Sequence, residues 1–224
     1  MLILIDKPKG MTSHDVVDEV RRITGEKRVG HGGTLDPNAT GLLIVGVGRE
    51  STKKLGQIAK NKKEYEAEIV LGEERDTDDS EGRKLAIFNS QFSINSQISK
   101  IQIIKVLNFF LGVQEQVPPL YSAIKIKGKK AYKLAREGKK VVLQPRKVVI
   151  YSIKLLSYSY PVLRISCLVS SGTYIRALAR DIGRKLGCGA YLKELRRTKI
   201  GDYNLSEAVS LTDLKALIKK DGDI

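Results

Sequence analysis

Two strand-like segments, residues 146–158 and 162–170, stand almost next to each other in the chain, with only the three residues "SYP" between them. A connection this short joins antiparallel neighbours, whereas parallel strands need a crossover of a dozen or more residues. Further buried or alternating strands are expected at residues 2–5, 42–48 and 65–72, and helical segments interrupt the series. The pattern predicts an α/β (α+β) fold, with a mixed, largely antiparallel sheet flanked by helices.

Helical periodicity is clearest at residues 173–187, where Thr173 is expected to cap the helix and Gly187 to end it. Its apolar stripe consists of Ile175, Leu178, Ile182 and Leu186. A second helix is expected to begin at Ser13, as its cap, and residues 25–41 read as a long glycine-rich loop. Shorter helices are expected from Ser51 and within residues 98–110, 129–138 and 212–219. No linker-like stretch divides the chain, which favours one continuous domain.

The charge of the chain is strongly unbalanced, with 40 Lys and Arg against 25 Asp and Glu, a net charge of +15. This favours a polyanionic partner, with nucleic acid ahead of a membrane surface, although a lysine-rich genome would give the same excess. No apolar run approaches the roughly 18 residues of a membrane span. Cys167 and Cys188 lie far from any other cysteine, and we expect both as reduced thiols in a cytosolic protein.

Several chemistries have little support in the sequence. The two histidines and two cysteines are not at metal-ligand spacing, and no phosphate-binding loop, dinucleotide motif or nucleophile elbow occurs. The segment "DTDDSEG" begins like a calcium loop, but Glu81 stands where that loop needs glycine and Ile87 where it needs glutamate. A solvated acidic loop is the expectation there.

The stretch "GHGGTLDPNATGLLIVG", from Gly30 to Gly46, concentrates special backbone chemistry around one carboxylate, Asp36. Glycines permit positive φ or the close approach of a large ligand to the backbone. Pro37 has a fixed φ and biases Asp36 toward extended geometry, so the carboxylate would be held in one pose. The alternative is that Asp-Pro-Asn is an ordinary turn.

The same stretch closely resembles the catalytic motif of the TruB family of tRNA pseudouridine synthases. Four other segments are similar to the family's motifs and follow the family's order: "LILIDKPKGMTSHDVV", "KEYEAEIVLGEERDTDDSEG", "QVPPLYSAIKIKGKKAYKLAREGK" and "SSGTYIRALARDIGRKLGCGAYLKELRRTKIG". Together these segments span residues 2–201. So broad a match predicts the pseudouridine synthase fold.

Three site residues follow from the resemblance in the amino-terminal motifs. Asp36 matches the family's catalytic carboxylate. His31 matches a histidine that lies against the T loop of the tRNA, although it could equally be a solvated loop histidine. Lys7, in "DKP", matches a lysine near the site.

Four more residues match the family's substrate pocket. Tyr65 corresponds to a tyrosine that stacks on the target base, and Tyr174 to one that lines the pocket. Arg176 corresponds to an arginine beside the catalytic carboxylate, and Leu195 to an apolar wall. Each has a plainer interpretation from the residues alone: a packed aromatic for Tyr65, a surface residue for Arg176, a core residue for Leu195.

The implied activity is the isomerisation of uridine 55 in the T loop of tRNA to pseudouridine. The reaction gains and loses no atoms, so it implies no cofactor and no metal. The implied partner is the T arm of tRNA, bound by a monomer with no membrane association, and the basic segment 127–140 would face phosphates. Residues 1–202 would form the catalytic domain and residues 203–224 a short helical tail, where the family usually adds an RNA-binding domain. The alternatives are a guide-RNA-dependent synthase and a non-catalytic RNA-binding or tRNA-folding protein.

Overall fold

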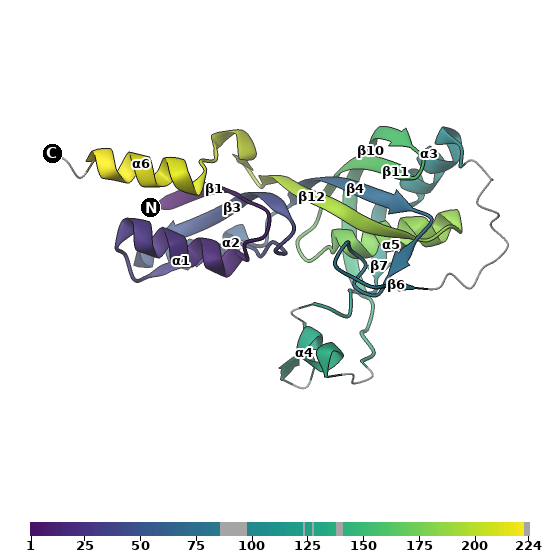
Figure 1. Cartoon of the computed structure of the whole chain (residues 1–224), viewed down its shortest axis with the longest axis horizontal. Helices are drawn as coiled ribbons and strands as arrows, with labels where there is room; N and C mark the ends of the chain where they lie inside the picture. Colours follow the sequence, from purple (N-terminus) through teal and green to yellow (C-terminus); the bar gives the residue numbers. More distant parts are fainter. Residues whose placement is uncertain (86–97, 123, 127, 138–140, 222–224) are drawn as a thin grey trace. The chain divides into compact units, whose positions relative to one another are not determined.

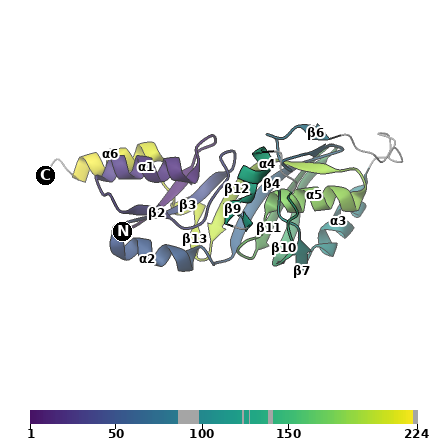
Figure 2. The same cartoon turned by 90° about the horizontal axis from the view of Figure 1, so that it is seen from below.

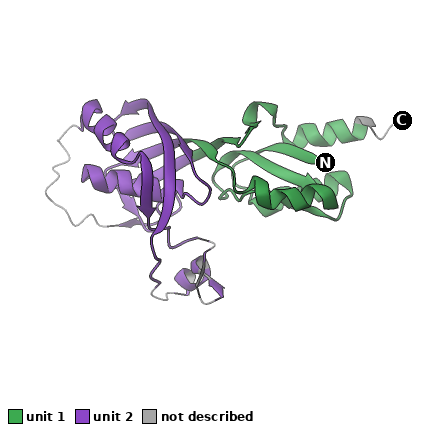
Figure 3. Ribbon diagram, turned by 180° about the vertical axis from the view of Figure 1, so that it is seen from behind, with its two compact units in different colours: residues 1–66, 195–224 green, residues 67–194 purple. Residues whose placement is uncertain are grey.

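The chain folds as two compact units in a computed structural model that describes residues 1–85, 98–122, 124–126, 128–137 and 141–221. Unit 1 comprises Met1–Glu66 and Leu195–Ile224, and unit 2 comprises Ala67–Glu194 (Figure 3). Two strands, β4 (Lys63–Leu71) and β12 (Ala190–Ile200), contribute residues to both units. The division into residues 1–202 and 203–224 stays a prediction.

Unit 1 is a small sheet with helices on both faces. Its strands are β1 (Leu2–Lys7), β2 (Val29–His31), β3 (Thr40–Val47), the end of β12, and β13 (Tyr203–Asn204). The order is β1-β3-β12, with β2 also paired to β3 and β13 to β12. β1 runs antiparallel to β3, and β12 runs parallel to it with Arg197 opposite Gly41 (Figure 1).

Successive side chains of β3 point to opposite faces of this sheet, and each face packs against different helices. Leu43 and Val45 pack with α1 (Ser13–Thr24) and with α6 (Leu211–Asp221), whose Leu214 is buried. Leu42 and Ile44 point to the other face and pack with α2 (Arg49–Ile58). Figure 2 shows α2 on the side of this sheet opposite to α1 and α6. A short 3-10 helix, η1 (Leu205–Glu207), precedes α6. α6 therefore contributes Leu214 to the core of unit 1.

Unit 2 contains the expected hairpin. β10 (Arg146–Ser159) and β11 (Val162–Val169) pair antiparallel, in a sheet ordered β12-β4-β11-β10-β7, with β7 at Gly112–Gln116. The helices α3 (Lys100–Phe109) and α5 (Ile175–Leu186) pack against each other. The remaining elements are short: β5 (Glu74–Arg75), β6 (Lys84–Leu85), β8 (Lys125–Ile126), β9 (Lys129–Lys130) and α4 (Ala131–Arg136). The predicted mixed α/β class with a largely antiparallel sheet is confirmed.

Details of several predicted elements differ. The predicted loop 25–41 contains β2, and α2 begins at Arg49 rather than at Ser51. The prediction that residues 127–140 face phosphates falls partly on residues 127 and 138–140, which lie outside the described residues, and it stays a prediction.

Both predicted helix caps are wrong. Thr12 caps α1, in a reciprocal capping box with Asp15, while the Ser13 hydroxyl is engaged elsewhere. The cap residue of α5 is Tyr174, and its side chain forms no capping hydrogen bond. The Thr173 hydroxyl donates instead to the Ser170 carbonyl at 2.9 Å. The apolar stripe predicted for α5 is buried, and Gly187 ends the helix in the left-handed conformation, as predicted.

Candidate active site

Asp36 lies in the loop between β2 and β3 of unit 1, where its side chain is half-buried. Its carbonyl accepts from the Ala39 amide at 3.1 Å, which closes a turn directly after it. The next residue, Pro37, has its carbonyl bound by the Gly10 amide at 2.9 Å and by the Lys7 Nζ at 3.0 Å. The carboxylate therefore stands on a backbone that is held on its carboxyl-terminal side.

Lys7 ends β1 and is fully buried, an unusual place for an ammonium group. Its Nζ donates to the carbonyls of Pro8, Met11 and Pro37 at 2.6–3.0 Å, which satisfies its three donors. Burial lowers the pKa of Lys7 from 10.5 to about 8. The negative charge of Asp36 opposes this shift, and the positive charge of Arg197 reinforces it. The ammonium thus lies within electrostatic range of Asp36, and its role in a site stays a prediction.

The lowered pKa of Lys7 predicts a pH-dependent stability. Between about pH 8 and 10.5 the unfolded chain keeps this proton and the folded chain loses it, so the free energy of unfolding gains a positive slope with pH. Replacing Lys7 with Met should remove that contribution to the slope. Urea unfolding of the native chain and of Lys7→Met across this range measures it; parallel pH profiles would contradict the assignment.

His31 is the last residue of β2 and precedes the glycines of the loop. Its pKa lies below the ordinary value, chiefly because of burial and then because of the charges of Arg197 and His14. Burial and these two positive charges therefore favour the neutral form of the imidazole over the charged form.

Tyr65 and Leu195 are the other predicted pocket residues in unit 1. Tyr65 lies on the buried face of β4 and is only 6% exposed, so the interpretation as a packed aromatic stays open beside that of a stacking platform. Leu195 lies in β12, where its carbonyl accepts from the Thr40 hydroxyl at 3.4 Å. This bond places Leu195 beside the start of β3, the strand that follows the Asp36 loop.

Tyr174 and Arg176 belong to unit 2, at the start of α5. The buried side chain of Gln116, in β7, accepts from the Tyr174 amide at 2.9 Å and donates to the Tyr174 carbonyl at 3.1 Å. This pair of bonds holds the backbone of Tyr174 on both sides. Gln116 is thus a support of the Tyr174 backbone that the sequence did not reveal.

The acidic loop after β5 is partly buried and bound by arginines, rather than fully solvated as predicted. Arg176 forms an ion pair with Asp79 at 3.3 Å and donates to the Thr77 carbonyl at 3.1 Å. Arg180 pairs with the buried Asp78 at 2.8 Å. α5 therefore fastens this loop through two arginines one turn apart. The predicted pairing of Arg176 with Asp36 joins residues of different units and stays a prediction.

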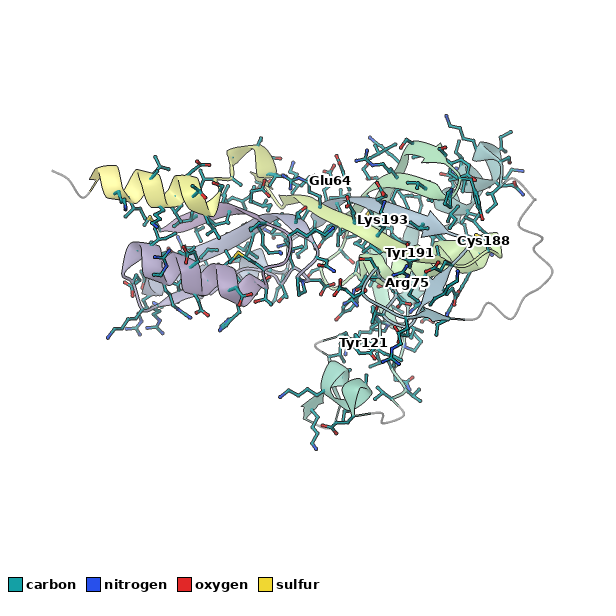
Figure 4. The ribbon with its side chains drawn as sticks, in the orientation of Figure 1. Glu64, Arg75, Tyr121, Cys188, Tyr191 and Lys193 are labelled. Atoms are coloured by element: carbon teal, nitrogen blue, oxygen red, sulfur yellow. The ribbon has the colours of Figure 1, made fainter. Side chains whose placement is uncertain are left out.

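Arg75, in β5 just before the acidic loop, makes two further contacts. Arg75 lies over the ring of Tyr191, 4.1 Å from its centre, and donates to the Ser80 carbonyl at 2.7 Å (Figure 4).

Among the described residues, no group of three or more His, Cys, Asp and Glu could hold a metal ion. None of the described helices combines the length and apolar character needed to cross a bilayer. Cys167 and Cys188 are buried, and neither forms a disulfide within the described residues.

Comparison with known proteins gives the family. Residues 21–175 match the model of the N-terminal domain of TruB family pseudouridylate synthases, and residues 176–223 match the model of the tRNA pseudouridylate synthase B C-terminal domain. The chain belongs to the TruB family of pseudouridylate synthases, and by this membership it is an isomerase, as predicted.

Two curated relatives are both named tRNA pseudouridine synthase B. The chain is 48% identical over 223 residues to tRNA pseudouridine synthase B of Dehalococcoides mccartyi strain CBDB1, covering all of this chain and 72% of that protein. It is 43% identical over 225 residues to tRNA pseudouridine synthase B of Thermobifida fusca, covering 96% of this chain and 74% of that protein.

Solved structures show the same fold. A chain of the Cbf5-Nop10-Gar1 complex superposes with a TM-score of 0.75 at 31% identity, covering 99% of this chain. A chain from an H/ACA RNP bound to a substrate RNA containing 2′-deoxyuridine gives a TM-score of 0.73 at 28% identity. This chain spans only 56% and 55% of the lengths of those two chains.

Proposed function

We propose that this chain is a tRNA pseudouridine synthase that isomerises uridine 55 in the T loop, with Asp36 as its catalytic carboxylate. The observation that carries the proposal is Asp36 itself, standing on a loop that buried side chains hold by its backbone, in a member of the TruB family. The names of the curated relatives support tRNA as the substrate.

The reaction begins with a base-flipping step. A uridine stacked in a folded loop cannot reach a carboxylate, so it must leave the stack at a cost of a few kcal/mol. Tyr65, as a stacking platform, would recover about 1–3 kcal/mol. Leu195 would exclude water from the pocket and so prevent hydrolysis of the broken nucleoside.

The isomerisation exchanges one bond for another. The N1–C1′ bond breaks, the uracil rotates, a C5–C1′ bond forms, and the proton leaves C5 while N1 regains one. Asp36 acts either as the nucleophile at C1′ or as a base toward the ribose. All atoms of the substrate return in the product, so the chemistry needs no cofactor.

Tyr174 is our candidate for removing the proton from C5. Its backbone is fixed by Gln116, and its phenol oxygen is the atom removed in Tyr174→Phe. That variant should form product about 100-fold more slowly, the scale of a lost general base, with tRNA binding near normal. Single-turnover rates and filter-binding affinities measure the two effects; unchanged turnover would remove Tyr174 from this role.

The partner we propose is the T arm of tRNA, bound by a monomer in the cytosol. With a net charge of +15, binding should rest largely on phosphate contacts, so the logarithm of the association constant should fall steeply and linearly with that of the salt concentration. Titration of an unmodified tRNA transcript at several salt concentrations tests this. A shallow dependence would contradict phosphate-dominated binding.

The proposed target is tested with an unmodified tRNA transcript and a matched transcript carrying cytidine at position 55. After incubation with the purified chain alone, pseudouridine is mapped across both RNAs. Modification at position 55 of the first transcript and nowhere in the second supports the proposal. Tight binding of both transcripts without modification would favour the non-catalytic RNA-binding alternative.

A further inference from the structure

The backbone around Asp36 is bound by side chains from three separate elements. On its amino-terminal side, the carbonyls of Gly33 and Thr34 accept from Arg197 at 3.1 and 3.3 Å. On its carboxyl-terminal side, the Pro37 carbonyl accepts from Lys7. These bonds leave the loop little freedom on either side of the carboxylate.

The remaining neighbour of Asp36 is Leu35, and both of its backbone groups are bound to Ser13. The Ser13 hydroxyl donates to the Leu35 carbonyl at 3.0 Å and accepts from the Leu35 amide at 2.8 Å. Ser13 is buried at the start of α1. Because the Ser13 hydroxyl is bound to Leu35, the side chain that caps α1 is that of Thr12.

Arg197 is placed for this task by β12. It is fully buried, and its Nε donates to the Leu42 carbonyl at 2.8 Å, which ties the guanidinium to β3 as well as to the loop. The two strands approach closely because Gly41 has φ +97° and no side chain; a Cβ there would lie 2.4 Å from the Arg197 carbonyl oxygen.

The bonding pattern of Arg197 separates it from an ordinary buried ion pair. All of its hydrogen bonds among the described residues go to backbone carbonyls, two of them within the Asp36 loop. The planar guanidinium offers donors from three separate nitrogens, and these reach carbonyls on β3 and in the loop; a lysine ammonium would offer all its donors from one point. Burying a charged group lowers the free energy of unfolding unless its hydrogen bonds compensate, and here two of those bonds go to the Asp36 loop.

We propose that Arg197 is a positioning residue for Asp36: it fixes the Gly33–Thr34 backbone, and with Ser13 and Lys7 it sets the direction of the carboxylate. This inference rests on the proposed function, in which Asp36 carries out the chemistry. Arg197 itself is not proposed to touch the substrate.

The test is Arg197→Lys in the full chain, which keeps the charge and removes the planar guanidinium. Misplacing a catalytic group by about 1 Å costs about 100-fold, so kcat should fall by about that factor while KM for tRNA stays within about threefold. The matched control is Arg21→Lys, whose arginine also donates to a unit 1 carbonyl, that of Val29, but not in this loop. Its kcat should stay within about twofold of the native value.

Hydrogen exchange of the peptide covering residues 33–39 tests the same inference without any activity. Exchange in this peptide should accelerate in Arg197→Lys and remain native in Arg21→Lys. An inactive native chain with accelerated loop exchange in Arg197→Lys would overturn the proposed function and leave the loop-holding role standing. Unchanged kcat, a change confined to KM, or native exchange of the loop would overturn the positioning role.

Ser13→Ala covers the case in which Arg197→Lys does not fold, which thermal unfolding detects. Loss of its hydroxyl removes both hydrogen bonds to the Leu35 backbone, so kcat should fall by about tenfold or more at unchanged KM. Native kcat in Ser13→Ala would then overturn the proposal.

Discussion

Asp36→Asn should form pseudouridine about 10⁴-fold more slowly than the native chain or not at all, the scale of losing a nucleophile that acts with its neighbours as a unit. Asparagine has the shape of aspartate but neither its charge nor its basicity, so it can neither attack C1′ nor take a proton from the ribose. Affinity for tRNA should remain near native, because phosphate contacts elsewhere dominate binding. Rapid-quench single-turnover assays and binding titrations measure the two quantities.

The matched control is Asp18→Asn, an exposed aspartate of α1 that pairs with Arg21 on the surface. It changes the net charge by the same amount and should react at the native rate. If Asp36→Asn retained more than about a tenth of the native rate, Asp36 would not be the catalytic group.

Arg180→Met should lower the free energy of unfolding by about 3–5 kcal/mol at neutral pH, because it leaves the buried carboxylate of Asp78 without its closest cation. Burial already raises the pKa of Asp78 from 3.8 to about 6, against the opposing charges of Arg180 and Arg176. A raised pKa means that the folded state binds more protons between these values, so stability rises as the pH falls through this window. Removing Arg180 raises the pKa further, and part of the lost stability should return at about pH 5.

Urea unfolding at both pH values measures the effect, and Asp78→Asn combined with Arg180→Met provides the control. The double variant buries no unpaired charge, so it should be more stable at neutral pH than Arg180→Met alone. Equal loss in both, with no recovery in acid, would show that Arg180 acts through packing rather than through Asp78.

Elements with strong local signals are the ones that could be predicted. The hairpin of β10 and β11 follows from two apolar segments with three residues between them, and α5 follows from a regular apolar stripe that ends at a glycine. The caps could not be predicted from residue type alone. Thr12 and Ser13 are adjacent and chemically equivalent, and the choice is decided by Leu35, 22 residues beyond Ser13, which binds the serine.

In the candidate site, too, features with a local sequence signal could be predicted and long-range contacts could not. The loop of Asp36 is visible because its glycines and proline crowd into one short stretch. Arg197 is not, since its partners lie 155–164 residues away and its neighbour Arg196 has the same side chain but pairs with Asp6 near the surface. Gln116 supports Tyr174 across 58 residues of sequence. Asp79 is one of several carboxylates in an acidic stretch, and only its ion pair with Arg176 of α5 sets it apart.

The most direct test of the central claim uses tRNA transcribed with uridine that carries tritium at C5. Forming the C5–C1′ bond expels this hydrogen, so each turnover releases one tritium to water. With no cofactor added, the native chain should release one equivalent per tRNA, and Asp36→Asn should release none. No release by the native chain, or equal release by both proteins, would contradict this claim.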